Sequence, residues 1–182
     1  FPGSSAEITL PPKPAFPKIF TLTAMIWPTR LESGKQVVFS IGKADSGPGL
    51  MLGLAEDGHP WVAARLADGD WVEVILKGSL GERRWARLSV DVNSLTNTLT
   101  LRTRSGETRE ASHVVSDKPI ALSTETPDSL IIAAAQTPGP RLNFNGKIEG
   151  PAIQEGNFKP DESDWAQNRN ALFAQWDFSK RI

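Results

Sequence analysis

Apolar and polar residues alternate with a period of two along most of the chain, and few folds are compatible with this pattern. In the segment 20–26, Phe20, Leu22, Ala24 and Ile26 would share one face of an extended strand. The same spacing recurs in other segments, with these candidate inward-facing sets: Val37, Phe39 and Ile41; Ala86, Leu88, Val90 and Val92; Leu99 and Leu101. Because successive side chains of a strand point to opposite faces of its sheet, the pattern predicts strands with one buried and one solvated face.

Turn-forming residues separate these apolar runs. They lie at 46–49, Asp57-Gly58, 68–70 and Ser105-Gly106, and residues of this kind bound strands rather than helices. The chain shows no regular alternation of strands with helices, which a parallel sheet would require. We therefore expect an all-β fold in which two antiparallel sheets pack face to face.

The segments 61–66 and 71–76 predict one hairpin with a defined register. Their inward-facing residues must meet across the two strands, and a three-residue loop, Asp68–Asp70, satisfies this condition. The predicted register pairs Leu66 with Val72 and Arg65 with Glu73.

One segment near the end of the chain predicts a helix. Asp161 follows Pro160 and can cap residues 162–176, which begin with an acidic turn. The large apolar residues of this segment fall close to one helical face: Trp165, Leu172, Phe173 and Trp176.

The chain of 182 residues is long enough for one ordinary domain. Five prolines in the first 18 residues predict an extended lead-in or an edge strand. We expect three parts: a Pro-rich lead-in at 1–18, a β-sandwich domain at 19–160, and a helix with the start of a linker at 161–182. Because the chain opens at Phe1 rather than at methionine, we expect it to belong to a longer protein.

Composition excludes several classes of function. The formal net charge is -1 and no basic block is present, which argues against binding of nucleic acid through its phosphates. The chain has no cysteine, so disulfide and thiol chemistry are excluded. No apolar run approaches the roughly 20 residues that cross a bilayer as a helix.

Five segments, in their order along the chain, resemble a known fold. They are "FTLTAMIWPT", "KQVVFSIG", "GLMLGLAEDG", "RRWARLSVDV" and "RLNFNGKIEGPAI", and they resemble strands of laminin-G-like, concanavalin A-like jelly rolls. The resemblance covers roughly residues 16–154 and implies a jelly-roll β-sandwich. It implies little about activity, because folds of this kind serve many functions.

The ending "AQWDFSKRI" after such a jelly roll is similar to the large subunit of N,N-dimethylformamidase-type proteins. This resemblance implies a non-catalytic accessory domain of a larger, cytoplasmic amide hydrolase, with other domains or subunits of that protein as partners. The family's iron centre uses tyrosine and glutamate ligands. This chain has no tyrosine, so the iron would lie elsewhere in the parent protein and no cofactor is expected here.

The stretch "NFNGKIEG", residues 143–150, allows two interpretations. In the first it is a strand whose Phe144 and Ile148 face the core. In the second, oxygen atoms near it help to bind calcium, which takes about six to eight oxygen ligands from several loops. The candidate ligands are Asp57, Asp68, Asp70 and Asn145, although turn chemistry alone also selects Asp and Asn at such positions.

Trp61 and Trp71 are the best candidates for ligand contacts. In the predicted hairpin both indoles point to solvent, where they can stack on sugar rings or on a partner surface. The first interpretation makes the chain a carbohydrate-binding, lectin-like module, with or without calcium. The second has a neighbouring domain cover both indoles.

No catalytic residue is predicted. His59 and His113 lack a metal-ligand spacing, and no Gly-x-Ser-x-Gly elbow is present. Glycosidases of this fold place acidic residues at alternating positions of one strand, and no such E-x-D-x-E pattern occurs.

Overall fold

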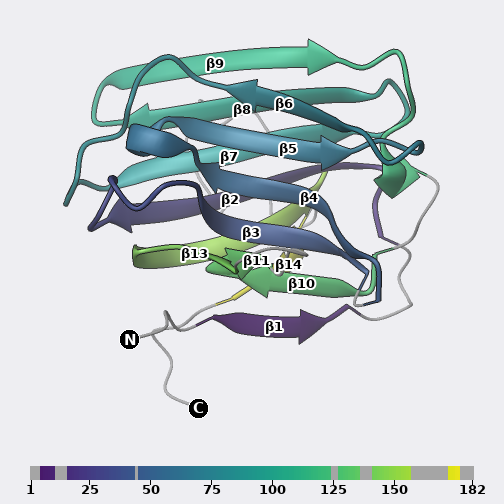
Figure 1. The fold of residues 1–182 in the computed structure, drawn as a ribbon, viewed down its shortest axis with the longest axis horizontal. Helices are drawn as coiled ribbons and strands as arrows, with labels where there is room; N and C mark the ends of the chain where they lie inside the picture. The colour runs from purple at the N-terminus through teal and green to yellow at the C-terminus, as the bar shows by residue number, and fades with distance from the viewer. Residues whose placement is uncertain are drawn as a thin grey trace.

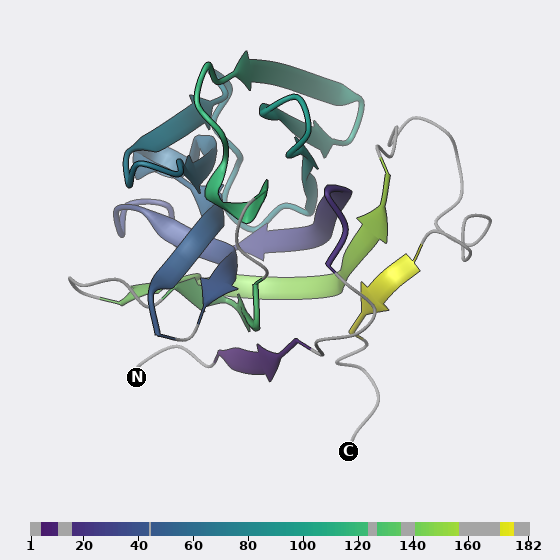
Figure 2. The same cartoon turned by 90° about the vertical axis from the view of Figure 1, so that its right-hand side faces the viewer.

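The computed structural model describes residues 5–10, 16–43, 45–123, 127–135, 141–156 and 172–176. These residues form two antiparallel six-stranded sheets that pack face to face (Figures 1 and 2). The all-β sandwich predicted from the alternation is therefore confirmed. Within the described residues, no helix has the length and apolarity that crossing a membrane requires.

The first sheet, sheet A, has the strand order β1-β10-β3-β4-β5-β6. Its strands are β1 (Ala6–Thr9), β10 (Ser129–Ile132), β3 (Gln36–Lys43), β4 (Gly47–Leu54), β5 (Pro60–Arg65) and β6 (Trp71–Ile75). The edge strand β1 comes from the Pro-rich lead-in and lies at the bottom of the view in Figure 1.

The second sheet, sheet B, has the order β14-β13-β2-β7-β8-β9. Its strands are β14 (Leu172–Gln175), β13 (Gly146–Glu155), β2 (Ile19–Pro28), β7 (Ala86–Asn93), β8 (Thr98–Ser105) and β9 (Thr108–Val115). The smaller elements are a two-stranded hairpin, β11 (Ala134–Ala135) with β12 (Leu142–Asn143), and two 3-10 turns, η1 (Glu56–Gly58) and η2 (Ala121–Ser123).

The core between the sheets contains the residues that alternation assigned to it, with one exception. The predicted sets from β2, β7 and β8 are all buried in the main core, as are Phe39 and Ile41 of β3. Val37 is also buried, but it belongs to a separate cluster on the outer face of sheet A. The register of β3 against β4 shifts between Val37 and Phe39. Such a bulge inserts one residue, so the side chains that precede it in the strand point to the opposite faces of the sheet. Val38 therefore replaces Val37 in the main core.

The hairpin of β5 and β6 keeps the predicted faces but not the predicted register. Arg65 pairs with Trp71 and Ala64 with Val72, so the pairing is displaced by two residues. The loop has three residues as predicted but begins one residue earlier, since the Leu66 N–H donates to the Asp70 carbonyl at 2.7 Å. This placement puts Gly69, with φ of 96°, at the third loop position, where a three-residue hairpin loop requires positive φ.

The predicted C-terminal helix is wrong where it can be compared with the structure. Residues 172–175 form β14, which pairs with β13 across Ile153 and Ala174. Residues 161–171, including Trp165, lie outside the described part of the chain. Phe173 and Trp176 bury part of their surface against the sandwich core. They make this contact without forming a helix, so their spacing did not indicate helical structure.

The stretch at 143–150 follows the strand interpretation. Phe144 is buried in the main core and Ile148 packs against it while remaining half-buried. Gly146, between them, lies so close to the Phe144 ring that an added Cβ would stand 2.8 Å from two of its ring carbons. The glycine therefore permits close packing, as a strand glycine often does.

Replacing Gly146 with alanine is expected to destabilise the protein. The added methyl would overlap the backbone carbonyl oxygen of Trp27 as well as the Phe144 ring. Steric overpacking costs typically about 1–3 kcal/mol, and we expect the free energy of unfolding, measured by urea denaturation, to fall by that amount. Gly81→Ala serves as the matched control, because its added Cβ would meet only the flexible Arg84 side chain; its effect should stay within about 1 kcal/mol. Equal effects of the two substitutions would contradict the packing argument.

Candidate functional site

An open groove of about 600 Å³ lies on the outer face of sheet A. It crosses strands from β1 to β6, so its lining comes from segments far apart in the sequence. The side chains that can contact a ligand are mostly polar or charged, and they are Glu7, Ser40, Lys43, Asp45, Ser46, Met51, Arg65, Trp71, Ser129 and Ile131.

Small residues on the floor leave room for the groove. Ser129 pairs with Gly42, and Ile131 with Ser40, so serine and glycine occupy neighbouring positions on this face. At Gly42 the backbone of the next strand approaches closely: an added Cβ would lie 2.8 Å from the backbone nitrogen of Gly49. Only glycine fits such an approach, so the floor carries no side chain at Gly42. Met51 and Ile131, the cross-strand partners of Ser40, add apolar surface beside it.

Trp71 and Arg65 form the side of the groove nearest β6. They are direct cross-strand partners, and the Trp71 side chain remains 40% exposed. Arg65 donates through Nη1 to the Ser46 carbonyl at 3.5 Å, which connects β5 with the β3–β4 turn. The result is an accessible indole next to a guanidinium, with hydroxyl groups on the floor. An indole supplies a flat apolar surface, and polar groups around it fix the orientation of a ligand.

Trp61 does not share this role, and its predicted exposure is wrong. It lies on the outer face of sheet A as expected, but it is only 1% exposed. Neighbours from β11, β12 and the start of β3 cover it, among them Ala135, Leu142 and Val37. The Lys35 ammonium lies 4.6 Å from the centre of the indole ring. Residues distant in sequence provide this cover, so a two-strand argument could not anticipate it.

The four candidate calcium ligands do not converge. Asp57 lies in η1, before β5, whereas Asp68 and Asp70 lie in the loop after β5. Six residues of strand separate these loops by roughly 20 Å. Asn145 lies at the Asp57 end, where its N–H donates to the Gln36 side chain at 2.8 Å. Among the described residues, no group of three or more His, Cys, Asp or Glu side chains is arranged to hold a metal ion.

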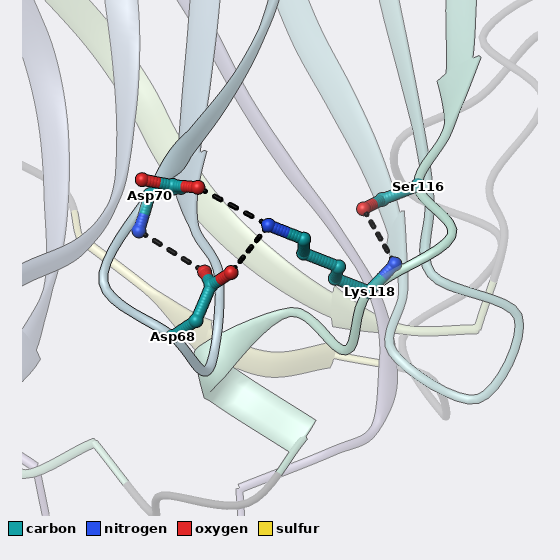
Figure 3. Close-up of polar contacts among 4 residues, drawn as sticks. All are labelled: Asp68, Asp70, Ser116 and Lys118. Atoms are coloured by element: carbon teal, nitrogen blue, oxygen red, sulfur yellow. Dashed lines mark hydrogen bonds and ion pairs between the residues drawn. The ribbon is translucent and has the colours of Figure 1, made fainter.

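Asp68 and Asp70 instead bind a lysine (Figure 3). The Lys118 ammonium contacts both carboxylates, at 3.2 Å from Oδ2 of Asp70, and the Asp68 Oδ1 accepts the Asp70 N–H at 3.1 Å. The Ser116 hydroxyl accepts the Lys118 N–H at 3.1 Å. These contacts join the β5–β6 loop to the segment after β9. Hydrogen bonding and charge from the aspartates raise the pKa of Lys118 to about 12, and bonding to Lys118 lowers the pKa of Asp68.

This ion-pair network predicts a pH-dependent stability. A raised lysine pKa contributes stability that is present below the ordinary value of 10.5 and is lost as the pH rises through about 12. A lowered aspartate pKa contributes stability that is present above the ordinary value of 3.8 and is lost as the pH falls through the lowered value. Urea unfolding midpoints of the wild type and of Lys118→Met should therefore differ at pH 7 and converge at both extremes. A difference that stays constant at every pH would contradict this.

The two histidines lie apart. His59 precedes β5, and its Nδ1 lies 3.1 Å from the Leu76 carbonyl oxygen. His113 lies in β9 of the other sheet, opposite Thr100. Their separation on two sheets gives no catalytic pair.

Comparison with solved structures identifies the fold. The chain is similar to the CBM40 domain of a Ruminococcus gnavus IT-sialidase bound to α2,3 sialyllactose, with a TM-score of 0.64, 15% identity and 79% coverage of each chain. It is also similar to the LG1-3 region of the laminin α2 chain, with a TM-score of 0.62, 14% identity and 82% coverage of this chain. The fold is a concanavalin A-like, laminin-G-like jelly roll. Identities this low show the fold alone.

A third similar structure is the enzymatically active domain of bacteriophage CBA120 tailspike protein 2, with a TM-score of 0.67, 16% identity and 97% coverage of this chain. The chain spans only 29% of the laminin chain and 29% of the tailspike chain. Protein-family models and curated proteins gave no match to the sequence.

The sequence predicted an outward-facing, exposed Trp71, and Trp71 is 40% exposed, but it did not indicate most of the groove. Arg65 was recognisable as an outward-facing residue of its strand. Glu7, Ser40 and Ser129 carried no such signal, because each is an ordinary polar residue until strand order places it beside Trp71.

Proposed function

We propose that this chain is a carbohydrate-binding module and that its ligand occupies the groove on the outer face of sheet A. The observation that carries the proposal is the accessible Trp71 indole beside an open groove that is lined by both apolar and polar side chains. A pyranose ring has an apolar face, which can stack on the indole, and hydroxyl groups, which need hydrogen-bond partners. The groove supplies both kinds of contact.

The charges around the groove suit a saccharide better than an apolar ligand. Glu7 and Asp45 provide acceptors, while Lys43 and Arg65 provide donors. The similarity of the fold to a sialidase CBM40 domain seen with sialyllactose supports the same class of ligand.

A glycan array probed with the intact chain tests the proposal. We expect saturable binding to a subset of the glycans. Because the four candidate calcium ligands lie at opposite ends of β5, we expect EDTA to leave this binding unchanged. An array without signal, obtained with protein that is folded by circular dichroism, would contradict the proposal.

A second candidate function is that of a non-catalytic accessory domain in a larger amide hydrolase resembling the N,N-dimethylformamidase large subunit. The observation in its favour is that Trp71 and Ile75, both on the outer face of the edge strand β6, are 40% and 48% exposed. A neighbouring domain would bury both side chains. This proposal predicts that the isolated chain, supplied with iron, hydrolyses no amide. Turnover by the isolated chain would rule out the non-catalytic role.

A further inference from the structure

Sheet B carries a second groove, of about 230 Å³, on the outer face of β7, β8 and β9. It lies on the opposite side of the sandwich from the Trp71 groove. Four arginines line it, accompanied by small residues, and the set that faces outward is Arg87, Ser89, Arg102, Arg104, Arg109 and Ala111.

Three of these arginines form one row across adjacent strands. Arg87 pairs with Arg104, and Arg104 pairs with Arg109. Like charges directly opposite each other repel, and a bound anion would relieve this repulsion. Guanidinium suits such a ligand, because it presents several N–H donors in a planar fork that matches a carboxylate or sulfate group.

Two acidic side chains, on β7 and β9, have specific structural partners. Asp91 binds the guanidinium of Arg102 and accepts the Thr21 hydroxyl at 2.6 Å. Glu110 accepts the backbone N–H groups of Lys77 and Gly78 at 2.7 and 2.9 Å. Both carboxylates therefore stabilise the fold, and Glu110 points to the opposite face from the row. Glu149 of β13 is exposed and lies in line with the row, because it pairs with Met25, the cross-strand partner of Arg87.

Arg87 is the half-buried member of the row. Burial, and after it the positive charge of Arg104, lowers the pKa of Arg87. Both causes disfavour its charged form, and a bound anion would oppose both.

Two indoles lie beside the arginine row on the same face. Trp27 follows Met25, the cross-strand partner of Arg87, by two residues, and Trp85 precedes Arg87 by two. Residues two apart on a strand share a face. The two rings contact each other edge-on, with centroids 5.4 Å apart, and both side chains are half-buried. An indole offers an apolar surface that an inorganic anion cannot use. Tryptophan next to arginine therefore favours a ligand that carries a ring as well as a negative charge.

We propose that the outer face of sheet B binds an acidic saccharide. Arg104 and Arg109 hold its carboxylate or sulfate group, and the edge of the Trp27–Trp85 pair contacts its ring. The proposal does not depend on the Trp71 groove, which belongs to the other sheet.

Titration of the intact chain with a galacturonate trisaccharide tests this site. Calorimetry measures the Kd, and the NMR signals of the indole N–H groups report which tryptophans the ligand contacts. The trisaccharide should bind, shift the signals of Trp27 and Trp85, and bind more weakly as sodium chloride is raised. A neutral galactose trisaccharide should leave the signals of Trp27 and Trp85 unshifted. Arg104→Gln and Arg109→Gln, both at exposed positions, should each raise the Kd about tenfold, as loss of one charged hydrogen bond does.

Arg141→Gln is the matched control, since Arg141 is exposed and lies next to β12; its Kd should stay within about twofold of the wild type. Trp71→Ala should leave galacturonate binding intact. The proposal is overturned if Arg104→Gln and Arg109→Gln behave like the control, or if Trp71→Ala abolishes binding. Binding of sodium sulfate as tight as that of the trisaccharide, or tighter binding of a single-stranded oligonucleotide of equal charge, would also overturn it.

Discussion

Trp61→Ala is expected to lower the free energy of unfolding by about 3–5 kcal/mol, the range for truncating a buried aromatic residue. Trp61 is the largest of the fully buried side chains described in the structure. It is the centre of the cluster on the outer face of sheet A, which also contains Val37, Met51 and Ala63. Alanine would leave a cavity that sheet A and the β11–β12 hairpin could close only by moving together.

Urea denaturation at pH 7 measures this loss, and Trp61→Phe provides the control. Nε1 of Trp61 has no hydrogen-bond partner among the described residues, so phenylalanine removes a buried donor that contributes no bond. We expect Trp61→Phe to recover more than half of the stability that alanine loses. A loss below about 1 kcal/mol for Trp61→Ala would show instead that the indole is as exposed as the sequence suggested.

Trp71→Ala is expected to have the opposite profile, with a large effect on binding and a small one on stability. Truncating a tryptophan at the centre of a binding site costs at least about 2 kcal/mol, which corresponds to a roughly 30-fold higher Kd for the glycan identified by the array. Because Trp71 is 40% exposed and lies on an edge strand, the free energy of unfolding should change by no more than about 0.5 kcal/mol.

Isothermal titration with the selected glycan measures the change in Kd. Trp71→Phe should retain part of the affinity, since a smaller aromatic ring can still stack. Leu95→Ala is the matched control for loss of an exposed apolar side chain, because Leu95 is 69% exposed and lies outside the groove. If Trp71→Ala bound as tightly as the wild type, the groove on sheet A would not be the glycan site.

The alternation of apolar and polar residues was sufficient to predict the main core, because a strand has only two faces. Phe20, Leu22 and Ile26 had to lie on one side of β2, and burial of that side follows from the apolar content of the set. The same argument assigned the faces of β5 and β6 correctly. It could not locate their loop, because shifting a hairpin by two residues keeps every side chain on its face. The required positive φ of Gly69 decided the register.

The bulge at Val38 and the strand at 172–175 show where local patterns stop being informative. In the first case a single inserted residue moved Val37 to the opposite face without disturbing its apolar neighbours. In the second, Phe173 and Trp176 pack against the core from a segment whose strand β14 pairs with β13. Each outcome depended on the backbone that lay alongside, and the local sequence does not specify that backbone.

By itself, the amino-acid sequence determined that this chain builds two stacked antiparallel sheets and which side of most strands is buried, because a two-residue period and apolar burial are local properties. Only the tertiary structure decided that Trp61 is covered and Trp71 is accessible. It also decided that Glu7, Ser40 and Ser129 share a groove with Trp71, and that three arginines form a row. Those results depend on strand order and register, which bring together residues that are far apart along the chain.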